Sequence, residues 1–454
     1  MIFTVDFSVR DGKIKKELYG SGLHVFVSNR HIKDRYEEFQ NLKFPIVRNH
    51  DWALNNPGQR MIDIQHIFPL MHLDPGDPRN YYFAPSDEAI RLVYESGSKV
   101  FYRLGTSIEH TEGVHFNANP PEDFEKYAEV CAGVIRHYTE GWCHGFHYDM
   151  KYWEIWNEPD GHINMWTGTD EQFAEFFAVV LKRLKKEFPR LKIGGPAHCG
   201  FKPDLLDMLK KECDKRNVKP DFYSYHMYAN DLKTLEEYGT FPREYLDKIG
   251  WKGVKTCINE WHFIRGWGGV HSNVTEESYL RKINSRDGLH GSNSAAFNLA
   301  AFCIWQNSPL DMAFYYGCGT GDWGICRPSG AYNKNYYSLL MQRDMVYDYP
   351  VKVSVKGGPE SARAIAGISP DGKYGAILVS DLCGDSMKIP LKIQGLDGLP
   401  QVQCIVLDDN RNNESIDCSF DEDGLLQLSK SEPGSAAFLV TFSLKSKKGK
   451  NKKN

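Results

Sequence analysis

Short apolar runs alternate with longer amphipathic segments between residue 18 and about residue 340. In residues 121–138, apolar side chains recur three and four positions apart, which predicts a helix with one buried face. Residues 170–188 show the same period after Thr169, and Gln172 three positions later completes a capping-box start. The runs between such helices are rich in Val, Ile, Tyr and Phe, and they predict eight strands. These strands cover residues 18–24, 44–49, 100–104, 152–156, 192–195, 222–226, 255–259 and 300–305.

Strands that alternate with helices in this way predict a parallel sheet with helical crossovers. An α/β fold of the (β/α)8 TIM barrel type over residues 16–345 fits both the strand count and the length. A doubly wound open sheet is the competing fold. It is disfavoured because no G-x-G-x-x-G fingerprint follows the first predicted strand.

The pattern changes after about residue 345, where short strand-like runs follow one another without helices between them. Residues 346–445 therefore predict a C-terminal antiparallel β-sandwich domain, with a hairpin turn at Asp371-Gly372. Apolar residues also alternate within residues 1–15, and we expect this N-terminal strand to join the sandwich. The basic segment 446–454 predicts a disordered tail.

Composition and charge exclude several classes of protein. The 454 residues are 41% hydrophobic and 25% charged, as in ordinary globular proteins, and the net charge of -4 gives no argument for nucleic acid or a membrane surface as partner. The longest apolar run, residues 294–305, is too short to span a membrane. The 11 cysteines form no C-x-x-C pair, which favours free thiols in a reducing compartment. We expect a cytoplasmic protein, with secretion or a periplasmic location after removal of a signal peptide as the alternative.

Two carboxyl side chains follow predicted strands on opposite sides of the barrel. Glu158 comes just after the fourth strand, and Glu260, 102 positions later, comes just after the seventh. The carboxyl ends of barrel strands carry the active site, so these two groups are expected to face each other there. Paired carboxyls suit cleavage of a glycosidic bond, in which one donates a proton and the other attacks the anomeric carbon or activates water.

The motifs around these residues resemble the retaining glycoside hydrolases of clan A, most closely glycoside hydrolase family 39. The segments are "WEIWNEPDG" with "MWTGT" after it, "CINEWHF", "FPIVRNHDW" and "DFYSYHMY". Family 39 includes β-xylosidases and α-L-iduronidases. The resemblance implies that Glu158 is the general acid/base, that Glu260 is the nucleophile, and that Asn157 hydrogen-bonds the sugar 2-hydroxyl.

The resemblance also implies roles for five further residues. Arg48 would keep the nucleophile ionised, His50 would contact substrate, and His226 and Tyr228 would lie near the nucleophile. Trp305, at the end of the predicted eighth strand, would form the floor under the sugar. Trp261, His262, Trp267, Asp322 and Trp323 are weaker candidates for lining the site.

The main hypothesis is therefore a retaining exo-glycosidase of the β-xylosidase type that acts on an oligosaccharide or glycoside without metal or cofactor. It predicts carboxyls about 5–5.5 Å apart, whereas an inverting pair would be about 6.5–9.5 Å apart. The alternatives are an α-L-iduronidase-like or other clan A enzyme (an arabinosidase or galactosidase), a non-catalytic glycan-binding barrel, and a metal-dependent hydrolase using His144 and His147. Family 39 nucleophile segments usually read Thr-Glu, and Asn259-Glu260 departs from this pattern, so the sugar is left open. The oligomeric state is not predicted.

Overall fold

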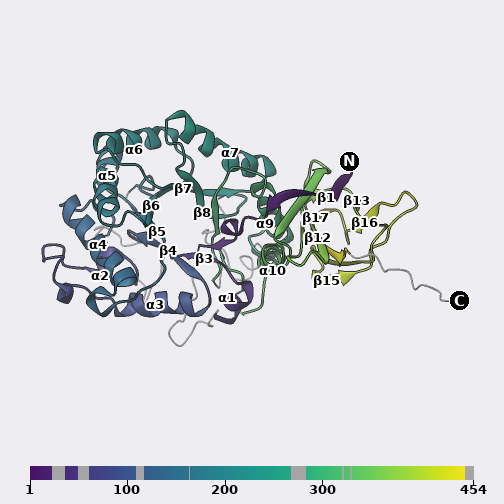
Figure 1. Cartoon of the computed structure of the whole chain (residues 1–454), viewed down its shortest axis with the longest axis horizontal. Helices are drawn as coiled ribbons and strands as arrows, with labels where there is room; N and C mark the ends of the chain where they lie inside the picture. The colour runs from purple at the N-terminus through teal and green to yellow at the C-terminus, as the bar shows by residue number, and fades with distance from the viewer. Residues whose placement is uncertain are drawn as a thin grey trace.

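The computed structural model describes residues 1–22, 36–49, 61–108, 117–162, 164–266, 283–319, 322–327 and 330–444. The chain forms a barrel and a separate sheet domain, which lie side by side in Figure 1 with α9 (Ser292–Trp305) and α10 (Lys334–Tyr347) between them. Of the described helices, none has both the length and the apolar character needed to cross a bilayer. The C-terminal tail predicted at 446–454 lies outside the described residues.

Eight parallel strands close into a barrel, as the alternating pattern predicts. Apolar side chains fill its lower interior, among them Phe101, Phe222, Met312 and Phe314. The polar layer described below lies nearer the carboxyl ends of the strands. The strands are β2 (Gly20–Ser21), β3 (Ile46–Arg48), β4 (Lys99–Leu104), β5 (Tyr152–Ile155), β6 (Lys192–His198), β7 (Phe222–Ala229), β8 (Lys255–Phe263) and β9 (Met312–Tyr315).

Helices surround the barrel and start at recognisable caps. Asp123 caps the helix at 124–140 by accepting a hydrogen bond from the Lys126 N–H, and Thr169 with Gln172 forms the predicted capping box. Besides α9 and α10, the described helices are α1 (Tyr36–Leu42), α2 (Ile64–Ile67), α3 (Ala84–Glu95), α4 (Phe124–Glu140), α5 (Asp170–Glu187), α6 (Pro203–Lys215) and α7 (Leu232–Lys248), with 3-10 turns η1 (Lys16–Leu18), η2 (Pro78–Asn80) and η3 (Trp142–His144).

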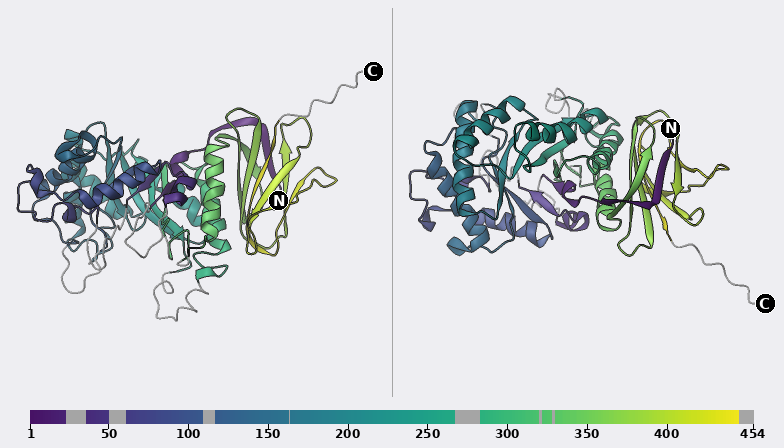
Figure 2. Two further views of the ribbon diagram at one scale, coloured as in Figure 1. Left: turned by 90° about the horizontal axis from the view of Figure 1, so that it is seen from below. Right: turned by 45° about the horizontal axis from the view of Figure 1, so that its top comes forward.

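The prediction of the eighth strand at residues 300–305 is wrong. This segment is the second half of α9, and the true eighth strand is β9, only four residues long. Every residue of α9 is buried, because the barrel covers one side of the helix and the sheet domain covers the other; both views of Figure 2 show this helical layer between the two domains. A helix buried on all sides has no polar face, so its sequence lacks the helical period that would identify it.

Nine strands make up the second domain, in the order β15-β14-β17-β12-β11-β10-β1-β13-β16. The N-terminal strand β1 pairs antiparallel with β10 and parallel with β13, so the chain begins in the domain in which it ends. The Asp371-Gly372 turn joins β11 to β12, with Gly372 at φ +72°. The strands are β1 (Phe3–Lys13), β10 (Val351–Gly357), β11 (Ala362–Ile368), β12 (Tyr374–Gly384), β13 (Lys388–Gln394), β14 (Val402–Leu407), β15 (Asn412–Ile416), β16 (Leu426–Ser429) and β17 (Gly434–Ser443).

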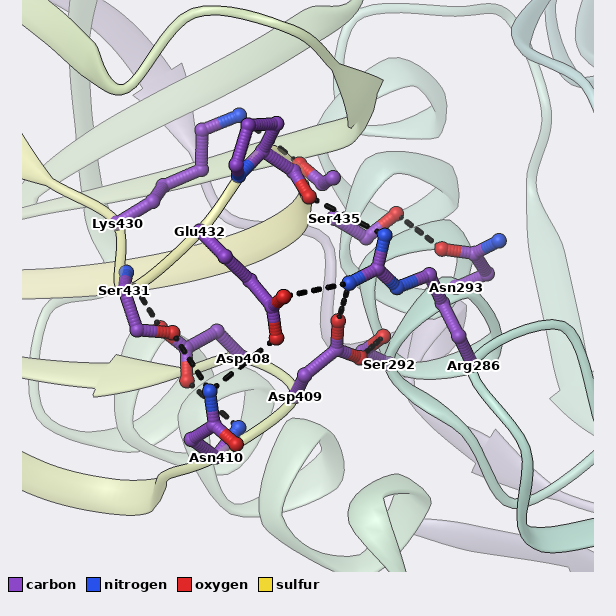
Figure 3. A network of polar contacts seen from close by, with 12 residues as sticks. Arg286, Ser292, Asn293, Asp408, Asp409, Asn410, Lys430, Ser431, Glu432 and Ser435 are labelled. Carbon is purple, nitrogen blue, oxygen red and sulfur yellow. Dashed lines mark hydrogen bonds and ion pairs between the residues drawn. The ribbon is translucent and has the colours of Figure 1, made fainter.

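The boundary between the domains combines apolar packing with a polar network. Leu378 and Leu439, on one face of the sheet, belong to the same apolar core as α9. Polar side chains lie where the loops of the sheet domain meet the start of α9: Ser435 Oγ donates to Asn293 Oδ1 over 2.6 Å, and Arg286 bonds to two carboxylates (Figure 3). The sheet domain is therefore fixed against the connection that follows β8.

Candidate active site

A sharp backbone turn after β5 carries Glu158. Trp156 and Glu158 both have positive φ angles, +71° and +45°, which non-glycine residues adopt rarely. Gly105 permits this turn, because an added Cβ there would lie 2.6 Å from Trp156 Cα. The Trp156 indole is fully buried and donates to Met165 O over 2.9 Å, so this residue anchors the turn by packing. Pro159 follows after β5 has ended at Ile155, and it has no N–H group to donate.

Glu260 lies within β8, and not just past its end as the sequence predicts. Along the pair β7–β8, Tyr225 is opposite Ile258 and His226 is opposite Glu260, so Asn259 is an extra residue. Such a bulge breaks the alternation of side chains, and Asn259 and Glu260 both reach the barrel interior. The bulge therefore turns Glu260 toward the carboxyl end of the barrel.

Glu158 and Glu260 meet on the imidazole of His226. Its Nδ1 lies 2.9 Å from Glu158 Oε1, and its Nε2 lies 3.4 Å from Glu260 Oε2. One oxygen of each carboxylate and one ring nitrogen all lie within 4.8 Å of one another. The prediction that these two carboxyls face each other across the barrel is confirmed as geometry.

Glu260 also accepts hydrogen bonds from Tyr228 and Arg48. The Tyr228 hydroxyl donates to Oε1 over 2.6 Å, and Arg48 Nη1 donates to Oε2 over 3.3 Å. Arg48 Nη2 also donates to Asn157 Oδ1 over 2.6 Å. These contacts place Arg48, Asn157, His226 and Tyr228 around the two carboxyls, where the motifs predict them.

The electrostatics of the cluster favour an ionised Glu260. Burial lowers the pKa of Arg48, but Glu154 and Glu260 more than offset this and raise it, so the guanidinium stays charged. Burial, and next the charge of Glu260, raise the pKa of Tyr228 well above its usual value, so its hydroxyl remains a donor. Burial also lowers the pKa of His226, yet the charges of Glu260 and Glu158 and the hydrogen bond to Glu158 raise it overall.

Comparison with known proteins agrees with this geometry. Residues 28–241 match the family model described as Glycosyl hydrolases family 39. The resemblance to family 39 is confirmed. The chain is 31% identical over 128 residues to a β-xylosidase of Geobacillus stearothermophilus, covering 27% of this chain and 25% of the relative. It is 29% identical over 167 residues to a β-xylosidase of Caldicellulosiruptor saccharolyticus, covering 34% and 32%. The chain thus spans about a quarter to a third of the length of these two relatives.

Solved structures share the fold of the whole chain. A glucosidase from Croceicoccus marinus superposes with a TM-score of 0.76 at 20% identity, over 98% of this chain and 100% of that one. A family 39 β-xylosidase from Caulobacter crescentus superposes with a TM-score of 0.66 at 12% identity, over 97% and 99%. The barrel followed by a β domain is therefore an arrangement with solved counterparts.

Trp305 is not part of the site, and its predicted role as floor under the sugar is wrong. It ends α9, outside the barrel, where its indole donates to Leu235 O over 3.0 Å and packs edge-on against Trp261 at 4.9 Å. Trp261 thus also faces away from the barrel interior. His50 and Trp267 lie outside the described residues.

Aromatic residues around the true eighth strand lie closer to the cluster. The Trp323 ring contacts Tyr228 at 5.5 Å, His262 at 5.3 Å and Tyr316 at 6.1 Å between centroids. Tyr316 directly follows β9, so it lies at the end of the eighth strand, where the sequence predicted Trp305. Sequence reasoning missed Tyr316 because the apolar run that ends α9, just before β9, predicts the eighth strand in its place.

Glu158, His226 and Glu260 are also the three residues, within the described part of the chain, whose ligand atoms are grouped closely enough to hold a metal ion. The contact of Arg48 with Glu260 opposes such an ion, because a cation already lies at one of its ligand oxygens. His144 and His147 belong to no such group among the described residues. The cluster thus suits proton sharing between two acids better than metal ligation.

Proposed function

We propose that this chain is a retaining glycoside hydrolase that removes a terminal sugar by double displacement. One observation carries the proposal: an oxygen of Glu158 and an oxygen of Glu260 lie within 4.8 Å of each other, with His226 touching both. This separation supports a retaining pair, because inverting enzymes hold their carboxyls about 6.5–9.5 Å apart to leave room for a water.

The surroundings of the two carboxyls differ, and the difference supports their roles. Glu260 is bonded to Arg48 and Tyr228, and its side chain is only 7% exposed. Two donors that favour the charged form suit a nucleophile. Glu158 has His226 as its described hydrogen-bond partner, and its side chain is 24% exposed, so water can reach it. That suits a group that first donates a proton to the leaving oxygen and then accepts one from water.

We infer that Asn157 binds the sugar. Its Oδ1 is occupied by Arg48, while its buried Nδ2 has no hydrogen-bond partner among the described residues. A buried donor without a partner is costly, and a substrate hydroxyl would satisfy it. We assign this donor to the 2-hydroxyl of the bound sugar, where hydrogen bonds strengthen as the transition state forms.

The chemistry then follows in two displacements. Glu260 attacks the anomeric carbon while Glu158 protonates the departing oxygen, which leaves a glycosyl-enzyme ester. Water then attacks the same carbon, Glu158 takes its proton, and Glu260 leaves as carboxylate. Arg48 and Tyr228 remain hydrogen-bonded to Glu260 as its charge is lost and restored. The names of the relatives favour a β-xyloside as the first substrate to test.

The test is a panel of 4-nitrophenyl glycosides of xylose, glucose, arabinose, galactose and iduronic acid, with NMR of the first-formed anomer. We expect release with net retention, greatest for β-xyloside, and a rate at least about 10⁴-fold lower for Glu260→Ala. Glu244→Ala, at an exposed site on α7, is the matched control and should behave as wild type. An inverted product, or no release from any glycoside, would refute the proposal.

A further inference from the structure

A third carboxyl group lies inside the barrel, below the two that the proposed mechanism uses. Glu154 is in the middle of β5, four residues before Glu158, and it is fully buried. Its neighbours Trp153 and Ile155 face the helices, so Glu154 faces the interior. A buried carboxylate is costly unless its oxygens are bonded, and double displacement assigns it no role.

Its hydrogen bonds come from three other strands. Oε2 accepts from Arg48 Nε of β3 over 2.7 Å. Oε1 accepts from Ser224 Oγ of β7 over 2.6 Å and from Asn259 Nδ2 of β8 over 2.7 Å. All three partners donate, so the ionised carboxylate is the form that satisfies every one of them.

The bond to Arg48 orients the guanidinium. With Nε held by Glu154, the plane of the fork is fixed, and the two remaining nitrogens face Glu260 and Asn157. Without this bond, the side chain would be free to turn about its last torsions. Glu154 therefore determines whether the cation meets Glu260.

The other two bonds lead to the backbone of both catalytic carboxyls. Asn259 is the extra residue of the bulge, and holding its amide fixes the strand direction just before Glu260. Ser224 Oγ accepts from Ala197 N over 2.9 Å, and Ala197 O accepts from Glu158 N over 2.9 Å. One buried carboxylate is thus linked to Glu260 through two routes and to Glu158 through a third.

We propose that Glu154 is a positioning residue, which holds Arg48 and Asn259 so that Glu260 stays charged and aimed at the anomeric carbon. The inference rests on the proposed function and deepens it. It goes beyond the two-carboxyl mechanism because Glu154 neither contacts substrate nor transfers a proton. The titratable groups that face this cluster within the described residues are Glu158, His198, His226, Tyr228 and Cys257.

The test is Glu154→Gln, which keeps the shape but replaces one acceptor by a donor. Arg48, Ser224 and Asn259 all donate hydrogen bonds to Glu154, so the NH2 group of the new Gln side chain would face a donor on one side. The contact with Arg48 is then lost or weakened. We expect kcat and kcat/KM to fall together by about 10²–10³-fold with KM little changed, the signature of an interaction required in the transition state. The acid limb of the kcat/KM profile should move to higher pH by about one unit, because Glu260 loses its cation.

The direction of that shift separates the possible roles. If Glu154 acted only through its charge, its neutralisation would make Glu260 easier to ionise and would move the limb to lower pH. If it served only to hold the fold together, the limb would not move. Either of these outcomes would overturn the positioning role.

Two further variants keep the test decisive. Asp381→Asn is the matched control: this carboxylate is buried in the sheet domain and pairs with Lys430 over 2.7 Å, so its loss should lower the melting temperature but leave the pH profile unchanged. Ser224→Ala removes one neutral donor and should lower kcat/KM by about 3–10-fold with the fold intact, which covers the case in which Glu154→Gln does not fold. An unchanged rate in Ser224→Ala would then count against the inference.

Wild-type activity on the glycoside panel separates the proposed function from the proposed role of Glu154. If wild type is active and both Glu154→Gln and Ser224→Ala match it, only the role of Glu154 is refuted.

Discussion

Arg48 and Arg286 each bridge a pair of carboxylates, and the two arginines differ in burial. Arg48 lies between Glu154 and Glu260 inside the barrel and is 0% exposed. Arg286 lies between Asp409 and Glu432 at the domain boundary, and its side chain is 41% exposed (Figure 3). The same residue types thus form similar bridges in a dry interior and at a wet edge.

Burial determines what each bridge can do. In the interior, charges interact strongly but cost several kcal/mol each to remove from water, so such a bridge adds little net stability. It does fix geometry, because each of the three guanidinium nitrogens of Arg48 that forms a bond has one partner: Glu154, Glu260 or Asn157. At the boundary, solvent weakens the interaction, and Arg286 shares a single nitrogen between both carboxylates.

The surroundings of Arg48 and Arg286 also differ. Around Arg48, neighbouring contacts are polar and lead to Glu158 and Glu260. Around Arg286, the boundary is already held by apolar packing of α9 against Leu378 and Leu439 and by separate bonds such as Ser380 Oγ to Ala296 O, 2.6 Å. The comparison teaches that the buried bridge of Arg48 fixes the geometry of the site, whereas the exposed bridge of Arg286 adds only a minor contact at the domain boundary.

Replacement of Arg48 should have the largest effect. Arg48→Ala leaves Glu154 and Glu260 buried without their cation, and we expect kcat/KM to fall by about 10³–10⁴-fold and the free energy of unfolding to fall by about 3–5 kcal/mol. Arg48→Lys retains the charge but not the fork, so it should recover the stability in part and the activity hardly at all. Glycoside kinetics measure the change in kcat/KM, and urea unfolding measures the change in the free energy of unfolding. If Arg48→Ala kept more than a tenth of the wild-type activity, the claim that the buried bridge fixes the geometry of the site would be wrong.

Tyr228→Phe should have the next largest effect on turnover. It removes the hydroxyl that donates to Glu260 Oε1 over 2.6 Å while keeping the ring against Trp323. We expect kcat/KM to fall by about 10–100-fold, because a hydrogen bond to a charged group is worth about 1.5–3 kcal/mol. The melting temperature should stay within a few degrees of wild type. A loss as large as that of Arg48→Ala would show that the hydroxyl contributes as much as the cation.

The barrel and the proposed catalytic pair, Glu158 and Glu260, were readable from the sequence because each has a local signal. Alternating apolar runs predicted seven of the eight strands in nearly the right places, and Glu158 and Glu260 stand out as acids next to strands. The eighth strand failed for a physical reason: α9 is buried between two domains and carries apolar residues on all sides, so its second half resembles a buried strand. Trp305 was misplaced by the same error.

Contacts that depend on three-dimensional register could not be predicted. The bulge at Asn259 changes which side chains face inward, and no residue pattern signals it in a strand. The partners of Glu154 come from strands up to 106 positions away in sequence. Its one local signal is an acid at an inward-facing position of an otherwise apolar strand, "YWEI". Such a residue can be suspected from sequence, but its role requires the fold.

Two buried histidines should respond to pH with opposite signs. Burial holds the pKa of His262 down at about 3; it lies between the Tyr315 hydroxyl and Phe263 O, and His290 adds a repulsion. Because the unfolded chain binds a proton near pH 6.5, this group's contribution to stability is full above pH 6.5 and is lost as pH falls toward 3. His226, with its raised pKa, contributes below pH 6.5 and loses that contribution as pH rises through its folded value.

His262→Gln isolates this effect. We expect the variant to lose less stability than wild type between pH 7 and pH 5, by about 2 kcal/mol, since each unit of pKa difference corresponds to about 1.4 kcal/mol. Chemical denaturation at both pH values measures it, with His144→Gln, at an exposed position in η3, as control. Equal pH slopes for His262→Gln and wild type would show that His262 does not carry the acid sensitivity.

Arg286→Ala should have the smallest effect and tests the other half of the comparison. It removes contacts to Asp409, Glu432 and Pro433 O, the last over 3.2 Å, but leaves the apolar boundary intact. Exposed ion pairs contribute about 1 kcal/mol or less, so we expect a change of that size in the free energy of unfolding, and a smaller one in high salt. Glycoside kinetics should match wild type, because Arg286 contacts none of the residues around Glu158 and Glu260 in the described part of the chain. A fall in activity of 10-fold or more would show that Arg286 affects the active site through the connection after β8. The difference in burial would then no longer explain the different roles of Arg48 and Arg286.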